Sequence, residues 1–124
     1  MIFERIKKEI NKDDIIPQPR EKGYKVKGYG KSRRNETRGE ETLVYFIPNH
    51  NNPSYPNEKR ISQSDWEKAF ACLSKDGVFN RKFFDSHIVC AKDGGCNFTA
   101  IGGVFCILGI AEYDNDKGHY RKKI

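Results

Sequence analysis

The sequence predicts an α+β protein in which residues 1–124 form a single domain. Three observations lead to this prediction. A chain of this length is typical of one domain, and its eight Phe, six Tyr and one Trp can build a core from few positions. Apolar residues recur at helical spacing near the N-terminus and in the second half. Runs of strand-like composition, bounded by turn residues, lie between these helices and after them.

The N-terminal element, residues 1–57, is predicted to begin with a helix and to continue into an antiparallel β-hairpin. Apolar residues at helical spacing, from Ile2 to Ile10, predict an amphipathic helix over residues 2–11. The segment from Pro48 to Pro56 is rich in Asn and Pro, which is typical of a connector.

Two runs of residues form the predicted hairpin. Residues 24–28 alternate with period two. This pattern directs Tyr24 and Val26 inward and directs Lys25 and Lys27 outward. Residues 42–47 are largely apolar on both faces, so we expect this strand to be covered on both sides and to pair with the first. The loop between the strands is strongly basic.

The C-terminal unit, residues 58–124, is predicted to contain three short helices and a second β-hairpin. Two overlapping pairs, Ser62 with Asp65 and Ser64 with Glu67, fit a capping box, in which each side chain satisfies a backbone N–H at the start of a helix. Polar caps and glycines bound the three helices, which run from Ser62 to Gly77, from Asn80 to before residues 92–95, and from Asn97 to Gly109. Residues 110–113 and 119–121 are the expected strands of the hairpin.

Large apolar side chains on these helices are expected to share one core. They are Trp66, Phe70, Phe83, Phe98, Ile101, Phe105 and Leu108. The adjacent glycines Gly102 and Gly103 disfavour a helix, so something is expected to approach closely there. A neighbouring helix is the ordinary explanation, and a ligand or a DNA backbone is the alternative.

Three compact helices followed by a hairpin resemble the winged-helix variant of helix-turn-helix domains. The resemblance covers residues 61–124 and is one of element order, not of a sequence motif. It implies that the third helix enters the major groove of DNA while the hairpin, or wing, touches the backbone or the minor groove. The outward residues of the third helix would be Asn97, Thr99, Ala100, Gly103 and Cys106. Because Phe98–Leu108 carries no charged side chain, direct readout of bases would be poor.

Positive charge is concentrated in two segments of the chain. The net charge is +6, and residues 20–38 alone contain eight basic residues against two acidic ones. A smaller basic excess lies at the C-terminus. This distribution is typical of a protein that grips phosphates at two places, although a basic surface that only aids solubility fits it equally well. The predicted nucleic-acid-binding residues are Lys25, Lys27, Lys31, Arg33, Arg34, Arg38, Asn97, Thr99, Lys117, His119, Arg121, Lys122 and Lys123.

Aromatic residues alternate with lysines in the first hairpin. Tyr24 and Tyr29 flank Lys25 and Lys27, and such interleaving suits nucleic acid because rings stack on bases while lysines follow phosphates. The alternative is that Tyr24 belongs to the core and Tyr29 covers the hairpin.

No metal, cofactor or catalytic site is predicted. Cys90 and Cys96 are separated by five residues, no C-x2-C pair occurs, and Cys72 and Cys106 lie in apolar helical stretches. His87 precedes Cys90 by three residues, but sequence proximity is weak evidence for a catalytic pair. The glycine pairs do not extend to a phosphate-binding motif, and the acidic pairs lack the partners of a nuclease.

The sequence therefore predicts a small, basic, non-enzymatic protein that binds DNA, or alternatively RNA, mainly through phosphates. A protein-interaction module or a small subunit of a larger complex, with a protein partner or a second copy of the chain, is the other interpretation. The absence of an export signal and of any long apolar segment predicts a cytoplasmic location without membrane contact.

Overall fold

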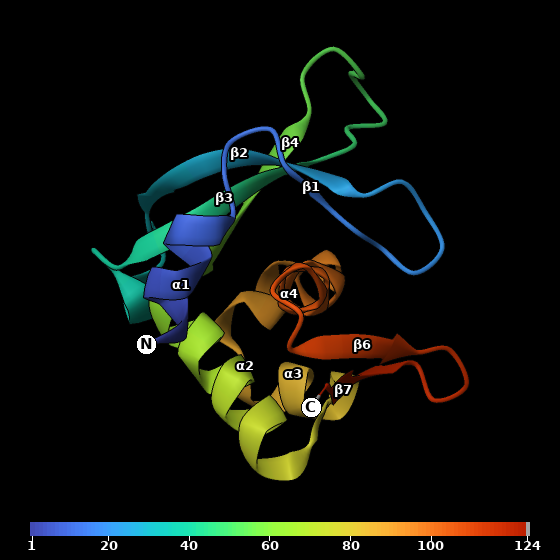
Figure 1. Ribbon diagram of the computed structural model, residues 1–124. Coiled ribbons are helices and arrows are strands. Elements are labelled where there is room, and N and C mark those ends of the chain that lie inside the picture. Colours follow the sequence, from blue (N-terminus) through green and yellow to red (C-terminus); the bar gives the residue numbers. More distant parts are fainter. Residues whose placement is uncertain (124) are drawn as a thin grey trace.

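The computed structural model describes residues 1–123 and has an α+β fold with two antiparallel sheets (Figure 1). The helices are α1 (Ile2–Glu9), α2 (Gln63–Asp76), α3 (Arg81–His87) and α4 (Cys96–Ile107), with short 3-10 helices η1 (Asn35–Thr37) and η2 (Val89–Asp93). The strands are β1 (Ile15–Ile16), β2 (Tyr24–Lys31), β3 (Glu41–Ile47), β4 (Asn57–Ser62), β5 (Val78–Phe79), β6 (Ala111–Asp114) and β7 (His119–Lys122). None of these helices has the length and apolarity needed to cross a membrane.

The larger sheet has the strand order β1-β2-β3-β4 and contains the predicted hairpin. Strands β2 and β3 pair antiparallel with Val26 opposite Tyr45, which confirms that hairpin. Tyr24 and Val26 are buried and the lysines that follow them are exposed, as the alternation predicts. A bulge between Val26 and Gly28 places both Lys27 and Gly28 opposite Val44.

Strand β4 continues this sheet beyond the unit boundary predicted after residue 57. It pairs with β3 along its whole length, so residues 57–62 lie in the N-terminal sheet and not in the C-terminal unit. Its first four residues, Asn57 to Arg60, are all polar or charged, and they give no periodic apolar signal. The strand forms because β3 offers it a complete backbone partner.

The smaller sheet has the order β5-β7-β6, so the predicted C-terminal hairpin gains a third strand, β5, from the segment before α3. The Asn80 side chain accepts a hydrogen bond from the Phe83 N–H at 2.8 Å, which confirms the predicted cap of α3. Gly77 and Gly109 follow α2 and α4 with φ values of 78° and 76°, the left-handed conformation that glycine favours.

Helix α4 lies between the larger sheet and the β6–β7 hairpin (Figure 1). The prediction that Asn97, Ala100 and Gly103 face outward is therefore wrong, because all three are buried. The larger sheet, the segment after β1 and η2 cover the side of the helix that the winged-helix resemblance leaves open. Thr99 and Cys106 remain partly exposed.

The predicted shared core is confirmed. Trp66, Phe98, Ile101, Phe105 and Leu108 are buried in one cluster, and Phe70 and Phe83 pack against it partly buried. The cluster also includes residues of α1 and of the larger sheet, so the two sheets and the helices share a continuous core.

The two adjacent glycines of α4 are sites of close approach, although no helix is the neighbour. A Cβ atom at Gly102 would overlap the ring of Tyr120, and one at Gly103 would overlap the backbone oxygen of Pro17. Both neighbours are parts of the same molecule. The glycines thus let β7 and the segment after β1 pack directly on the helix backbone.

We expect Gly102→Ala to lower the free energy of unfolding by about 1–3 kcal/mol, although alanine favours a helix by about 1 kcal/mol. The overlap with Tyr120 is the cause, so the loss should shrink in a Tyr120→Leu background. Urea denaturation of the two single variants and the double variant measures this coupling. Additive effects would contradict it.

Candidate functional site

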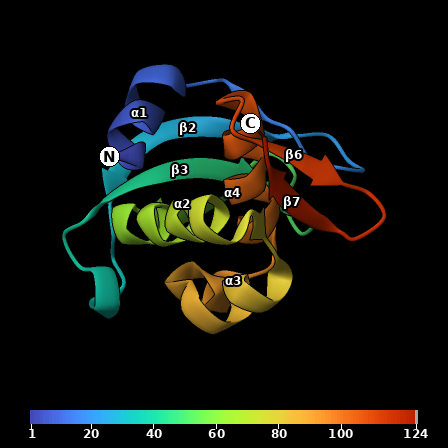
Figure 2. The same ribbon diagram turned by 60° about the horizontal axis from the view of Figure 1, so that its bottom comes forward.

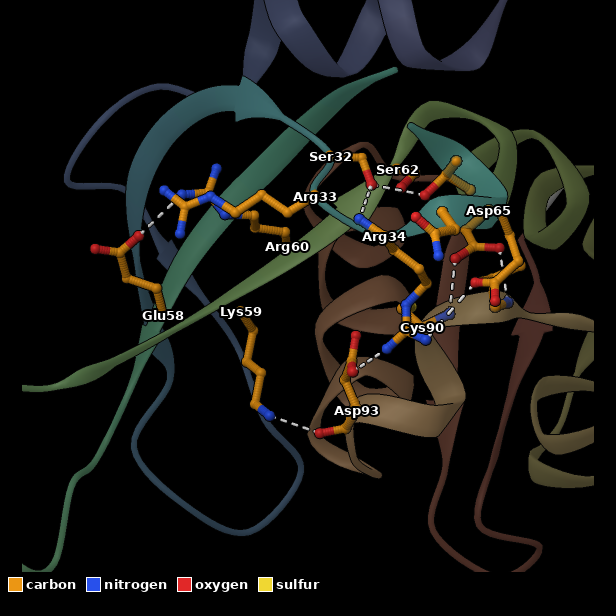
Figure 3. Close-up of a pocket in the computed structure, with 14 residues that line it drawn as sticks. Ser32, Arg33, Arg34, Glu58, Lys59, Arg60, Ser62, Asp65, Cys90 and Asp93 are labelled. Carbon is orange, nitrogen blue, oxygen red and sulfur yellow. Dashed lines mark hydrogen bonds and ion pairs between the residues drawn. The ribbon is translucent and has the colours of Figure 1, made fainter. Parts of the chain in front are cut away.

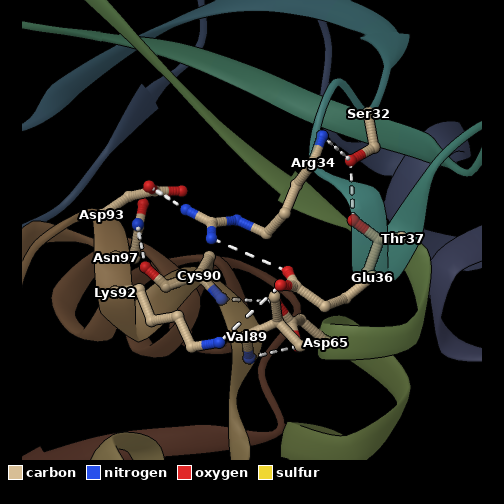
Figure 4. Close-up of polar contacts among 10 residues, drawn as sticks. All are labelled: Ser32, Arg34, Glu36, Thr37, Asp65, Val89, Cys90, Lys92, Asp93 and Asn97. Atoms are coloured by element: carbon tan, nitrogen blue, oxygen red, sulfur yellow. Dashed lines mark hydrogen bonds and ion pairs between the residues drawn. The ribbon is translucent and has the colours of Figure 1, made fainter.

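The β2–β3 loop carries the predicted residues Arg33, Arg34 and Arg38 and has a defined internal structure. Ser32 Oγ lies 2.6 Å from Thr37 Oγ1, and it accepts a hydrogen bond from the Arg34 N–H at 3.3 Å (Figure 4). The Ser32 N–H donates to the Glu40 carbonyl at 2.8 Å and closes the loop. The arginines are therefore held on a folded support.

The loop directs Arg34 inward. Its guanidinium forms an ion pair with Asp93 of η2 and lies 3.7 Å from Glu36 (Figure 4). Lys92 also lies 3.8 Å from Glu36. Arg34 is thus neutralised by carboxylates and fastens the loop to η2, a structural role that its charge alone does not reveal.

Asp65 anchors η2 from the opposite side. Its buried carboxylate accepts hydrogen bonds from the N–H groups of Val89 and Cys90, both at 2.9 Å. The predicted capping box is wrong in this respect, because Asp65 faces η2 and the Ser62 side chain makes no capping hydrogen bond, although Ser62 is the N-cap of α2. Glu40 from the basic loop instead accepts from the Ser64 N–H at 2.8 Å.

These elements enclose a polar cleft of about 560 Å³ between the β2–β3 loop, β4 and η2 (Figure 3). Its lining contains four cationic side chains, Arg33, Arg34, Lys59 and Arg60, and four carboxylates, Glu36, Glu58, Asp65 and Asp93. The charges balance, and Lys59 donates to the Asp93 carbonyl at 2.5 Å. The interior of the cleft therefore holds no excess of positive charge.

Positive charge exceeds negative charge at the rim of the cleft, because Lys27 from outside the lining joins Arg33 and Arg60 around Glu58 (Figure 3). Glu58 accepts from Lys27 Nζ at 2.6 Å and lies 3.4 Å from the Arg60 guanidinium. The hydrogen bond from Lys27, with the charges of Arg60 and Arg33, lowers the pKa of Glu58. Three cations thus surround a single carboxylate, and Arg33 forms no ion pair with any of residues 1–123.

The arginines of the β2–β3 loop do not meet the C-terminal basic cluster on one face, although the segment between β1 and β2 lies on the same side as that cluster. The β2–β3 loop and the β6–β7 hairpin lie at opposite ends of the molecule in both views (Figures 1 and 2). In the hairpin, Arg121 pairs with Glu112 at 2.8 Å, and His119 is half-buried 4.0 Å from Asp114. Lys117, Lys122 and Lys123 are exposed there, as are Lys31 and Arg38 in and beside the loop.

Asn97 and Thr99 serve the interior of the protein. Asn97 donates to the Cys90 carbonyl at 2.8 Å and accepts from the Tyr45 hydroxyl. Thr99 donates to the Cys96 carbonyl and lies 3.2 Å from the Tyr24 hydroxyl. The outward position predicted for Asn97 is excluded by its complete burial.

The aromatic residues next to the lysines also point inward. Tyr24 is buried, so the core interpretation of this residue is confirmed, whereas the half-buried Tyr29 packs against α1, where its hydroxyl donates to the Ile10 carbonyl at 2.7 Å. The aromatic ring beside Lys27 is Phe46, with Lys27 Nζ 5.9 Å from the ring centroid. Sequence reasoning missed Phe46 because residues 43–47 of β3 are all apolar, and it missed Glu58 and Arg60 because β4 was not predicted.

The cysteines behave as apolar residues. Cys72 and Cys90 are buried, Cys96 and Cys106 are half-buried, and all four thiols are free. Burial raises the pKa of Cys72 to about 11 and also raises the pKa of Cys90 and Cys106, which disfavours the thiolate that a metal or an electrophile needs. Within residues 1–123, no group of three His, Cys, Asp or Glu side chains is placed to hold a metal ion.

Neither a protein-family model, nor a curated protein, nor a solved structure matches this chain.

Proposed function

We propose that this protein binds nucleic acid, with DNA as the first candidate, through phosphate contacts and without catalysing a reaction. One observation carries the proposal: Lys27, Arg33 and Arg60 surround the single carboxylate of Glu58 at an exposed rim. The cluster has two more positive charges than negative ones. A bound phosphate would relieve the repulsion between the cations, and arginine can contact its oxygens in a bidentate geometry.

The order of the C-terminal elements supports the resemblance to winged-helix domains. Helix α2, strand β5, helices α3 and α4, and strands β6 and β7 follow one another, and β5 pairs with the wing strand β7. Because α4 is buried beneath the larger sheet, we propose that binding does not insert this helix into a major groove. Affinity would then come from exposed cations, with Lys117, Lys122 and Lys123 as a second, separate contact.

The salt dependence of binding tests the proposal. With about four to six phosphate contacts, the slope of log affinity against log salt should be near −4 to −5. Arg33→Ala and Arg60→Ala should each reduce the slope by about one and weaken all sequences alike. Arg34→Ala should change it less, because Arg34 is paired with Asp93 and Glu36.

Lys68→Ala is the matched control, since it removes one exposed charge from α2, away from the rim. Fluorescence anisotropy with a labelled DNA at several salt concentrations gives the slopes. An Arg33→Ala slope equal to that of Lys68→Ala would exclude the rim from the interface.

A protein-interaction module is the second candidate, and a groove of about 470 Å³ between α2 and α3 favours it. Ala71, Cys72 and Phe83 form an apolar floor that Lys68, Lys75 and Asp76 border, and the His87 ring packs on Phe83 with the centroids 4.8 Å apart. Failure to bind any nucleic acid at low salt would favour this candidate over the first.

A further inference from the structure

The larger sheet has one face that no helix covers. Side chains alternate between the faces of a strand, and Val26, Leu43 and Tyr45 point into the core shared with the helices. Figure 1 shows α2, α3 and α4 on that inner side. The intervening residues of β2, β3 and β4 form the opposite face, which we call the outer face. It carries Lys25, Lys27, Val44, Phe46, Glu58 and Arg60.

The outer face combines an aromatic ring with cations. Phe46 is partly exposed in β3, one of the two central strands, directly opposite Glu58 of β4, and Lys27 approaches its ring. Arg60 lies beside Gly30 and Val44, where it helps to bury the Val44 side chain. The ring therefore lies in a sheet surface that also carries Lys27, Arg60 and a single carboxylate, Glu58.

The charge of this face favours a polyanion. Lys25, Lys27, Arg33 and Arg60 supply four positive charges, whereas Asp13, 3.5 Å from Lys25, and Glu58 supply two negative ones. Exposed ion pairs of this kind are weak and exchange readily with a phosphate. The Asp13 and Glu58 carboxylates thus leave the cations available to an incoming strand.

The shape of the face distinguishes single strands from duplexes. A duplex hides the faces of its bases in the stack and is read by an element that enters a groove, whereas a single strand exposes base faces to aromatic side chains. The outer face is a sheet surface, and the helix that would enter a groove is buried. A ring within this sheet can stack on a base only if that base is unpaired.

We infer that the outer face binds single-stranded nucleic acid, with Phe46 stacking on one base while Lys27, Arg33 and Arg60 hold the neighbouring phosphates. This inference rests on the proposed function and names its substrate class. Val44, which lies buried beneath Arg60, supports this surface from below and makes no contact with the strand itself. Because an aromatic ring can stack on any of the bases, we expect binding to show little sequence preference.

The test compares labelled dT12 and U12 with a 12-base-pair duplex in anisotropy titrations at low salt. The single strands should bind more tightly than the duplex. Phe46→Leu keeps an apolar side chain in the sheet but removes the ring, and it should weaken single-strand binding by about 5- to 150-fold while leaving duplex binding unchanged. Phe46→Trp should retain the affinity. Circular dichroism and thermal unfolding confirm that both variants are folded.

The outcomes separate this inference from the proposed function. Equal binding of single strand and duplex, both weakened by Arg33→Ala, would overturn the inference and leave the proposed function standing. A single-strand preference that survives Phe46→Leu would remove Phe46 from the site and also overturn it. Absence of binding to all three probes at low salt would overturn both.

Discussion

Phe105→Ala is expected to lower the free energy of unfolding by about 3–5 kcal/mol, the cost of deleting a fully buried aromatic side chain. Phe105 has 0% exposure, and its ring centroid lies 5.9 Å from that of Trp66 and 6.4 Å from those of Phe70 and Phe79. Its removal leaves a cavity among aromatic rings from α2, β5 and α4. Since small domains are stable by only about 5–15 kcal/mol, much of the protein should unfold near physiological temperature.

Ile107→Ala provides the matched control for this prediction. Ile107 lies two residues further along the same helix but is 41% exposed, so its truncation should cost less than about 1 kcal/mol. Urea denaturation followed by Trp66 fluorescence measures both variants. A loss below about 1 kcal/mol for Phe105→Ala would contradict the central position of this ring in the core.

Asp65→Ala is expected to lower the free energy of unfolding by about 2–5 kcal/mol. The substitution leaves the N–H groups of Val89 and Cys90 without their partner in a buried region, and each unsatisfied buried group costs about 1–3 kcal/mol. The effect should be concentrated at η2. Hydrogen exchange of the Val89 and Cys90 amides should therefore accelerate more than exchange in α4.

Two further variants define the cause of this loss. Asp65→Asn keeps one acceptor oxygen and should cost less than Asp65→Ala, whereas Asp85→Ala removes an exposed carboxylate of α3 and should be nearly neutral. Unchanged protection of the two amides in Asp65→Ala would mean that Asp65 does not anchor η2. Contacts other than those of Asp65 would then hold η2 in place beside the cleft.

The basic rim illustrates how much of the candidate site could be predicted. The charge pattern identified Lys27 and Arg33 because a dense basic segment is visible in the sequence without any knowledge of the fold. It could not separate Arg33 from Arg34. Their difference depends on Asp93, which is 59 residues distant from Arg34 in the sequence and meets it only when η2 packs against the loop.

Phe46, the aromatic residue beside Lys27, could not be predicted from the sequence either. The sequence alternation correctly placed the lysines of β2 outward and Tyr24 inward, and that result itself removed Tyr24 from the exposed face. Phe46 shares the lysine face because β3 pairs with β2 in the register that sets Val26 opposite Tyr45. A strand that is apolar on both faces does not reveal which of its side chains belong to that face.

The sequence by itself determined the elements whose signals are local. The Asn80 cap, the glycines that end α2 and α4, the apolar spacing of α4 and the alternation of β2 each reflect a side chain acting on its own segment of backbone.

The tertiary structure decided where these elements face. Helix α4 has the spacing of a core helix on one side, but its other side is buried only because a sheet from the N-terminal half covers it, and this turns Asn97 from an expected contact residue into an internal hydrogen-bond partner. Strand β4 exists because β3 supplies its backbone partner. Both results depend on contacts between residues distant in sequence, and no local pattern encodes such contacts.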